Sequence, residues 1–62
     1  MDRSSLTVIR EAKGLSIRKL SERCSVSPTT IWAIENQKKS PTVRMLKKLG
    51  EGLECDPKVL ID

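Results

Sequence analysis

The 62-residue sequence has no His, Tyr or Phe, and only two cysteines, Cys24 and Cys55. Without His, the chain lacks both the usual ligand sets of zinc sites and a Ser/His/Asp or Cys/His catalytic group. The cysteines form neither a CxxC motif nor a disulfide framework, so we expect free thiols. These absences argue against an enzyme, a metal centre and a cofactor, and no small-molecule ligand is evident.

Long apolar runs are also absent. No stretch has the length of a signal-peptide core or a membrane span, so we expect a cytoplasmic protein with no membrane partner. The length suits a single domain over residues 1–62, which would bury only about 60% of its unfolded surface. Dimerisation would therefore be a natural source of extra stability.

The formal net charge is +4, and the basic residues are unevenly placed. Residues 16–41 carry five basic and two acidic side chains, whereas residues 42–62 carry four of each. A basic excess favours nucleic acid, because cationic side chains release the counterions condensed on phosphates. An ordinary solvated surface is the alternative explanation.

Apolar residues recur at helical spacing, and no strand pattern of useful length appears. The pattern predicts helices over about 5–13, 16–24, 28–36 and 42–52, and a short helical turn opened by Asp56-Pro57. Pro28 suits the first turn of the third helix, because the first helical N–H has no partner there anyway. Expected N-cap hydroxyls are those of Ser4 or Ser5, Ser16, Ser27 and Thr42.

The predicted core comes from the inward faces of these helices. Between the second and third helices, Ser25 and Val26 form a tight turn, and Val26 is expected to fill the gap between them. The expected inward residues are Leu6, Ile9, Ile17, Leu20, Cys24, Ile31 and Ile34, with a stripe of Val43, Leu46, Leu49 and Leu53 on the fourth helix.

From about Leu6 to Leu60 the sequence resembles the Cro/CI-type, or xenobiotic-response-element-like, helix-turn-helix regulators, which include phage repressors. The resemblance implies an all-α, compact, five-helix lambda-repressor-like domain, with the helix-turn-helix in helices two and three. The stretches that share the family's order and spacing are Ile9-Arg10-Glu11, Gly14-Leu15-Ser16, Leu20, Val26-Ser27, Thr30-Ile31, Ile34-Glu35-Asn36, Pro41-Thr42 and the leucines of helix four.

This resemblance implies sequence-specific binding of double-stranded DNA by a transcriptional regulator, which we predict to be a repressor. A homodimer would bind a partly palindromic operator with the recognition helix, about 28–36, in the major groove. The implied base contacts are Pro28, Thr29, Thr30 and Ala33. The implied backbone contacts are Ser16, Ile17, Ser27, Trp32, Lys38, Lys39, Thr42 and Arg44. Exposed helix-start residues, solvated lysines and a Trp32 packed on helix two are the alternatives.

Two further sets of residues, an ion pair and a dimer seam, are expected to have structural roles. The family often joins an arginine of helix one to a glutamate near the end of the recognition helix, which here are Arg10 and Glu35; a direct DNA contact by Arg10 is the alternative. Val59 and Ile61 are predicted dimer-seam residues, because the C-terminal segment carries more apolar side chains than a short turn buries.

The chain departs from the usual family pattern at four positions. Ile17 replaces a common glutamine that anchors helix two to DNA, and Ser25 stands where the turn usually has glycine. Gln37 replaces a frequent glycine, so we expect Asn36 to adopt the left-handed conformation instead. Gly50 replaces a usual alanine, either weakening helix four or letting another backbone approach closely.

Two other readings stay open. The same fold serves as a protein-interaction module of the antitoxin or coactivator-bridging type, whose partner would use the basic surface. The chain is also compatible with one domain of a larger regulator.

Overall fold

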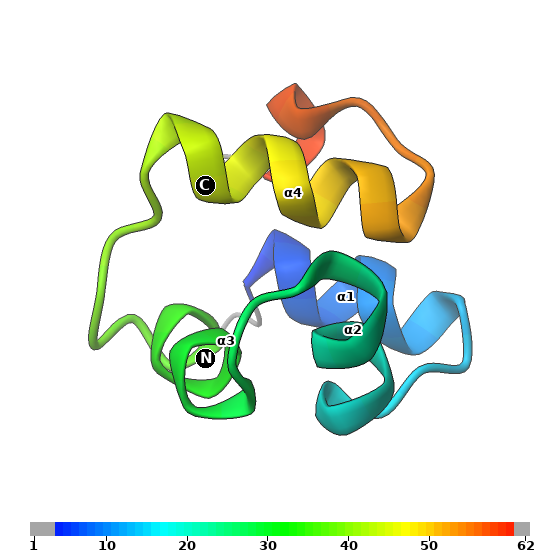
Figure 1. The fold of residues 1–62 in the computed structure, drawn as a ribbon, viewed down its shortest axis with the longest axis horizontal. Coiled ribbons are helices and arrows are strands. Elements are labelled where there is room, and N and C mark those ends of the chain that lie inside the picture. The colour runs from blue at the N-terminus through cyan, green and yellow to red at the C-terminus, as the bar shows by residue number, and fades with distance from the viewer. Residues whose placement is uncertain (1–3, 61–62) are drawn as a thin grey trace.

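The computed structural model describes residues 4–60, and over this range the fold is all α-helical (Figure 1). The elements are α1 (Ser5–Ala12), α2 (Ile17–Cys24), α3 (Pro28–Glu35), α4 (Val43–Leu53) and the 3-10 turn η1 (Pro57–Leu60). The all-α prediction is confirmed, whereas residues 4–60 contain four α-helices, so the expected five-helix count is not confirmed. The last element is one 3-10 turn, in which the Val59 N–H donates to the Asp56 carbonyl at 3.0 Å. Four residues opened by a proline are too few for an α-helical ladder.

Each α-helix begins after a hydroxyl side chain that accepts a bond from a backbone N–H. The four bonds are all 3.1 Å long, from Thr7 to Ser4, Lys19 to Ser16, Thr30 to Ser27 and Met45 to Thr42. The predicted caps are confirmed, with Ser4 rather than Ser5 at α1. Such caps matter here because three of the helices have only eight residues, a length that is unstable in isolation.

The end of α3 differs from the expectation. Asn36 has a φ of −96° and extends the helix, because its N–H still donates to the Trp32 carbonyl at 3.0 Å. Gln37 instead takes the left-handed conformation, at φ 58°. The Gln37 and Lys38 N–H groups then donate back to the carbonyls of Ile34 and Ala33, which closes a Schellman motif. The chain therefore reverses one residue later than predicted.

The core lies between α2, α4 and η1, with α1 packed on η1 and α3 on α2. In Figure 1, α4 crosses above α2 and α3, and the loop after α3 runs up one side of the molecule to reach it. The buried apolar residues are Leu6, Leu20, Cys24, Val26, Ile31, Ile34, Leu49, Leu53 and Leu60. Ile9, Ile17 and Leu46 are partly buried against them. The inclusion of Val43 was wrong: it is 71% exposed, because it stands in the first turn of α4 where the loop joins the helix.

Two glycines let other segments come close to α4. A Cβ on Gly52 would lie 2.9 Å from the Cys24 Sγ, and one on Gly50 would lie 2.9 Å from the Cys55 carbonyl. The close-approach explanation of Gly50 is therefore the correct one, and it extends to Gly52. Both cysteines are free, as predicted. The buried Cys24 thiol donates to the Leu20 carbonyl at 2.8 Å, and burial raises its pKa.

Candidate nucleic-acid interface

The turn between α2 and α3 is three residues long. Ser25 adopts the left-handed conformation at φ 58°, Val26 is buried in the core, and Ser27 caps α3. The predicted place of Val26 between the two helices is confirmed. A short turn whose central residue is buried fixes α3 relative to α2, and the outward side of α3 is therefore held in one orientation.

The outward side of α3 lies opposite Ile31 and Ile34, which face the core. By helical periodicity it carries Thr29, Trp32, Ala33 and Asn36. Thr29, Trp32 and Asn36 are exposed, and Trp32 is exposed by half. Trp32 therefore lies on this outward face together with Asn36, which was not among the site residues predicted from the sequence. Its position seven residues after Thr29, two helical turns on, was the signal that placed it there.

The predicted base contacts fall into two environments. Pro28 and Thr29 are exposed at the start of α3, and Ala33 is half-buried beside them. Thr30 is also half-buried, and its hydroxyl accepts a 2.7 Å hydrogen bond from the Ser27 hydroxyl. The hydroxyls of Ser27 and Thr30 are thus committed to the cap, which leaves Thr29 as the more accessible hydroxyl on this face.

The N-terminus of α2 lies beside the start of α3. Ile17, the first residue of α2, lines an open depression together with Pro28, Thr29 and Trp32. The Ser16 hydroxyl caps the Lys19 N–H, and Ile17 is half-buried against the core. The first turn of a helix presents amides without intrahelical partners, and such an end favours an anion.

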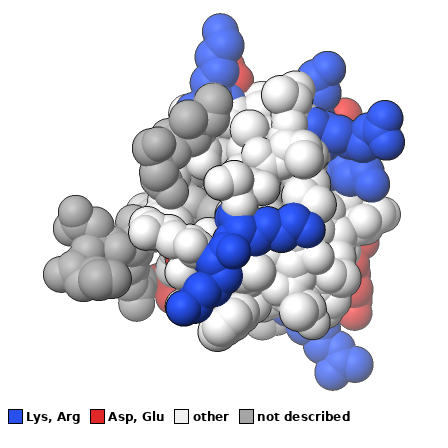
Figure 2. Space-filling view, turned by 90° about the vertical axis from the view of Figure 1, so that its left-hand side faces the viewer, with Lys and Arg blue, Asp and Glu red and all other residues white. Residues whose placement is uncertain are grey.

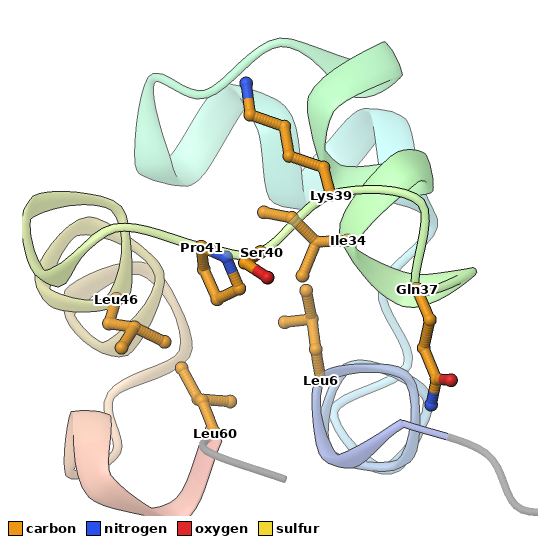
Figure 3. Close-up of a pocket in the computed structure, with 8 residues that line it drawn as sticks. All are labelled: Leu6, Ile34, Gln37, Lys39, Ser40, Pro41, Leu46 and Leu60. Atoms are coloured by element: carbon orange, nitrogen blue, oxygen red, sulfur yellow. The ribbon is translucent and has the colours of Figure 1, made fainter.

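Basic side chains follow α3 in the loop to α4. Lys38 and Lys39 are exposed, and so is Arg44 in the first turn of α4, next to the cap Thr42. A cavity of about 500 Å³ lies behind this loop, and Figure 3 shows the Lys39 side chain extending away from its apolar wall. Figure 2, which views the molecule from the side of this loop, shows more Lys and Arg than Asp and Glu on the surface.

Arg10 joins α1 to the end of α3. Its Nε donates to Glu35 Oε2 at 2.7 Å and its Nη2 to Glu35 Oε1 at 3.1 Å, while its Nη1 donates to the Leu15 carbonyl at 2.7 Å. Both side chains are largely buried, with exposed fractions of 11% and 5%. The bond to Glu35 and its charge raise the pKa of Arg10 against the opposing effect of burial. The pairing implied by the resemblance is present, as a bidentate ion pair that fixes three segments together.

Of the two predicted dimer-seam residues, Val59 is 49% exposed on η1. Ile61 lies outside the described residues.

The geometry of this surface suits the binding of DNA. An exposed helix is flanked by a second helix N-terminus and by a basic loop, and an α-helix fits the major groove of DNA. Over residues 4–60, no group of three or more His, Cys, Asp or Glu is placed to hold a metal ion. None of the helices in that range is long and apolar enough to cross a membrane.

Comparison with known proteins agrees with this geometry. The family model described as Helix-turn-helix matches residues 8–60, which is most of the chain. The protein therefore belongs to the Cro/CI-type, XRE-like helix-turn-helix family, whose general function is DNA binding in the regulation of transcription. Neither a curated protein nor a solved structure matches the chain.

Proposed function

We propose that this protein is a sequence-specific transcriptional repressor that binds a partly palindromic operator as a homodimer. The observation that carries the proposal is the outward face of α3, which is exposed, is held by capped helices and the Arg10–Glu35 pair, and is flanked by exposed basic residues. A helix that fits the major groove and is held in one orientation presents the same side chains to each DNA duplex that the protein binds.

In this proposal α3 enters the major groove with Pro28, Thr29, Thr30 and Ala33 at its leading end. A threonine can donate or accept a hydrogen bond, or offer its methyl to thymine. None of these residues makes a bidentate base contact, so DNA shape and deformability contribute to specificity alongside the few direct contacts.

Contacts to phosphates hold the helix in this position. The first turn of α2, at Ser16 and Ile17, and the first turn of α4, at Thr42, offer amides to the backbone. Ser27 and Trp32 lie beside the groove wall, and Lys38, Lys39 and Arg44 approach phosphates on the far side of α3. These side chains supply most of the salt-dependent affinity.

Two copies are proposed because a single eight-residue helix reads few base pairs. Two-fold symmetry places the half-sites about one helical turn apart. Val59 is half exposed on η1, away from the helix-turn-helix, and is proposed to lie in the seam with Ile61. Occupying an operator is enough to exclude another protein from it, so repression needs no additional surface. A cytoplasmic location stays a prediction.

Selection from a random duplex library at one stated salt concentration tests the proposal. Enrichment of an inverted repeat is expected, with half-site centres about one helical turn apart. Weak binding that disappears with salt and enriches no sequence would contradict it. The salt concentration must be fixed because it sets how much non-specific binding survives.

A protein-interaction module is the second candidate, favoured by one observation. The outward face of α3 carries no Arg or Lys, which are common base-reading residues. In that case, replacing Thr29 and Thr30 with alanine would leave DNA affinity unchanged, whereas the repressor proposal expects a loss.

A further inference from the structure

Ile17, Pro28, Thr29 and Trp32 form an apolar depression at the junction of α2 and α3, which we call the junction patch. Ile17 comes from the first position of α2 and the other three from the first two turns of α3. Trp32 is 50% exposed, although a tryptophan is normally largely buried. The patch is thus an apolar surface that the fold leaves uncovered.

The chemistry of the patch limits what it can bind. Ile17 and Pro28 offer only hydrocarbon side chains, and the polar groups of the other two side chains are the Thr29 hydroxyl and the indole N–H of Trp32, which can donate but not accept. Such a surface binds an apolar group and disfavours a donor or acceptor that it cannot pair.

The patch lies between two helix N-termini, capped by Ser16 and Ser27, and the exposed Arg18 follows Ile17 in the first turn of α2. Positive helix ends and an adjacent arginine favour phosphates around an apolar centre. This arrangement is complementary to the edge of a duplex, where phosphates flank the groove. On the major-groove edge of DNA, the apolar group is the C5-methyl of thymine.

We infer that the junction patch binds the C5-methyl group of a thymine in each operator half-site, making Ile17 and Trp32 specificity-determining residues. This inference rests on the proposed function and names the base feature that the site reads. Ile17 and Trp32 thus contact a base rather than only the backbone. Burial of the thymine methyl against this apolar surface favours thymine over the other bases, a preference that the few polar side chains of α3 do not provide.

The test removes one methyl group at a time from the DNA. In a selected operator, each thymine is replaced by deoxyuridine, and affinity is measured by fluorescence anisotropy at fixed salt. We expect one position per half-site at which loss of the methyl weakens binding about fourfold, the value of one buried carbon. Replacing both symmetric thymines should weaken binding about fifteenfold. No protein residue changes in this series, so misfolding cannot produce the effect.

Variants then locate the methyl on the protein. In Ile17→Ala and in Trp32→Ala, replacing the sensitive thymine with deoxyuridine should no longer change the affinity for the operator. Val8→Ala, which truncates another half-exposed apolar residue on α1, should keep the fourfold effect. Circular dichroism checks that each variant is folded.

Equal affinity for every deoxyuridine duplex would overturn the inference while leaving the proposed function intact. So would a fourfold loss that is the same in Ile17→Ala and Trp32→Ala as in the parent protein. If no duplex is bound specifically, the proposed function fails, and the inference fails with it.

Discussion

The two ends of α3 differ in how many contacts hold their side chains. At the C-terminal end, the Glu35 side chain is paired with Arg10, and the Asn36 side-chain amide donates to the Trp32 carbonyl at 2.9 Å. At the N-terminal end, the cap joins Ser27 to Thr30, while Pro28 and Thr29 face solvent. At the C-terminal end of α3, contacts within the protein fix the positions of these side chains. The side chains at the other end have few partners in the chain, which leaves them available to a partner molecule. Changes at the first end should therefore alter stability, and changes on the exposed side should alter binding.

The largest effect is expected from Glu35→Ala. It leaves Arg10 largely buried beside a missing carboxylate, and breaking such a pair costs about 3–5 kcal/mol. Because a domain of this size rarely has more stability than that from its core, the variant should be largely unfolded at 37 °C. Urea denaturation followed by circular dichroism measures the loss.

Glu22→Ala is the matched control for that variant. Glu22 is 63% exposed, and its contact with Lys19 is 3.8 Å long, so its removal should change stability by less than about 1 kcal/mol. Equal stability of the Glu35→Ala and Glu22→Ala variants would show that the C-terminal end of α3 is not held as described.

Gly52→Ala tests the packing of α2 on α4. Alanine gains about 1 kcal/mol of helix propensity over glycine. Its Cβ would lie 2.9 Å from the Cys24 Sγ, and we expect a net loss of about 1–3 kcal/mol. In a Cys24→Ala background the loss should shrink, because the sulfur is gone. An unchanged cost in that background would mean that another contact limits the approach.

Lys38→Ala and Lys39→Ala test the exposed side. Each should reduce the slope of log affinity against log salt by about 1, with similar losses on all duplexes. Stability should change by less than about 0.5 kcal/mol, since both lysines are exposed. Lys58→Ala, on η1, should leave the salt slope unchanged. A large loss of stability, or a slope equal to that of the Lys58 variant, would remove the loop from the interface.

The smallest effect is expected from Ser25→Gly. Ser25 adopts φ 58°, which costs a residue with a side chain about 1–2 kcal/mol, whereas glycine loses more chain entropy on folding. The net result should be a gain of about 0.5–1 kcal/mol. Ser21→Gly, inside α2, should show the opposite sign, with a loss of about 0.5 kcal/mol, because the helix propensity of serine lies between those of alanine and glycine. A destabilised Ser25→Gly variant would mean that the serine side chain contributes to the turn.

The sequence predicts the helix starts and the core positions of the molecule in detail. Ser16 and Ser27 mark helix starts because their hydroxyls satisfy local amides, and Leu20 and Ile31 mark the core because their spacing is helical. These effects act over a few residues, so a local pattern contains them. The family pattern added the Arg10–Glu35 pair, whose members are 25 positions apart.

The errors arise where the outcome depends on tertiary packing or on one hydrogen bond. Asn36 tolerates the left-handed conformation better than Gln37, yet the bond from its N–H to the Trp32 carbonyl keeps it helical. Val43 has the spacing of a core residue, but it is 71% exposed at the first position of α4, whereas Met45 and Leu46 of the same turn pack against the core. The role of Gly52 depends on Cys24, which lies 28 positions away and belongs to another helix.

Selection from a random duplex library with the parent protein and Thr29→Ala in parallel tests the central claim most directly. Thr29 is exposed on the outward face of α3, so the free energy of unfolding of the variant should lie within about 0.5 kcal/mol of that of the parent protein. We expect the parent to enrich an inverted repeat, and the variant to enrich the same repeat with preference lost at one position in each half-site. An identical enriched sequence for both proteins, or none for either, would contradict the account.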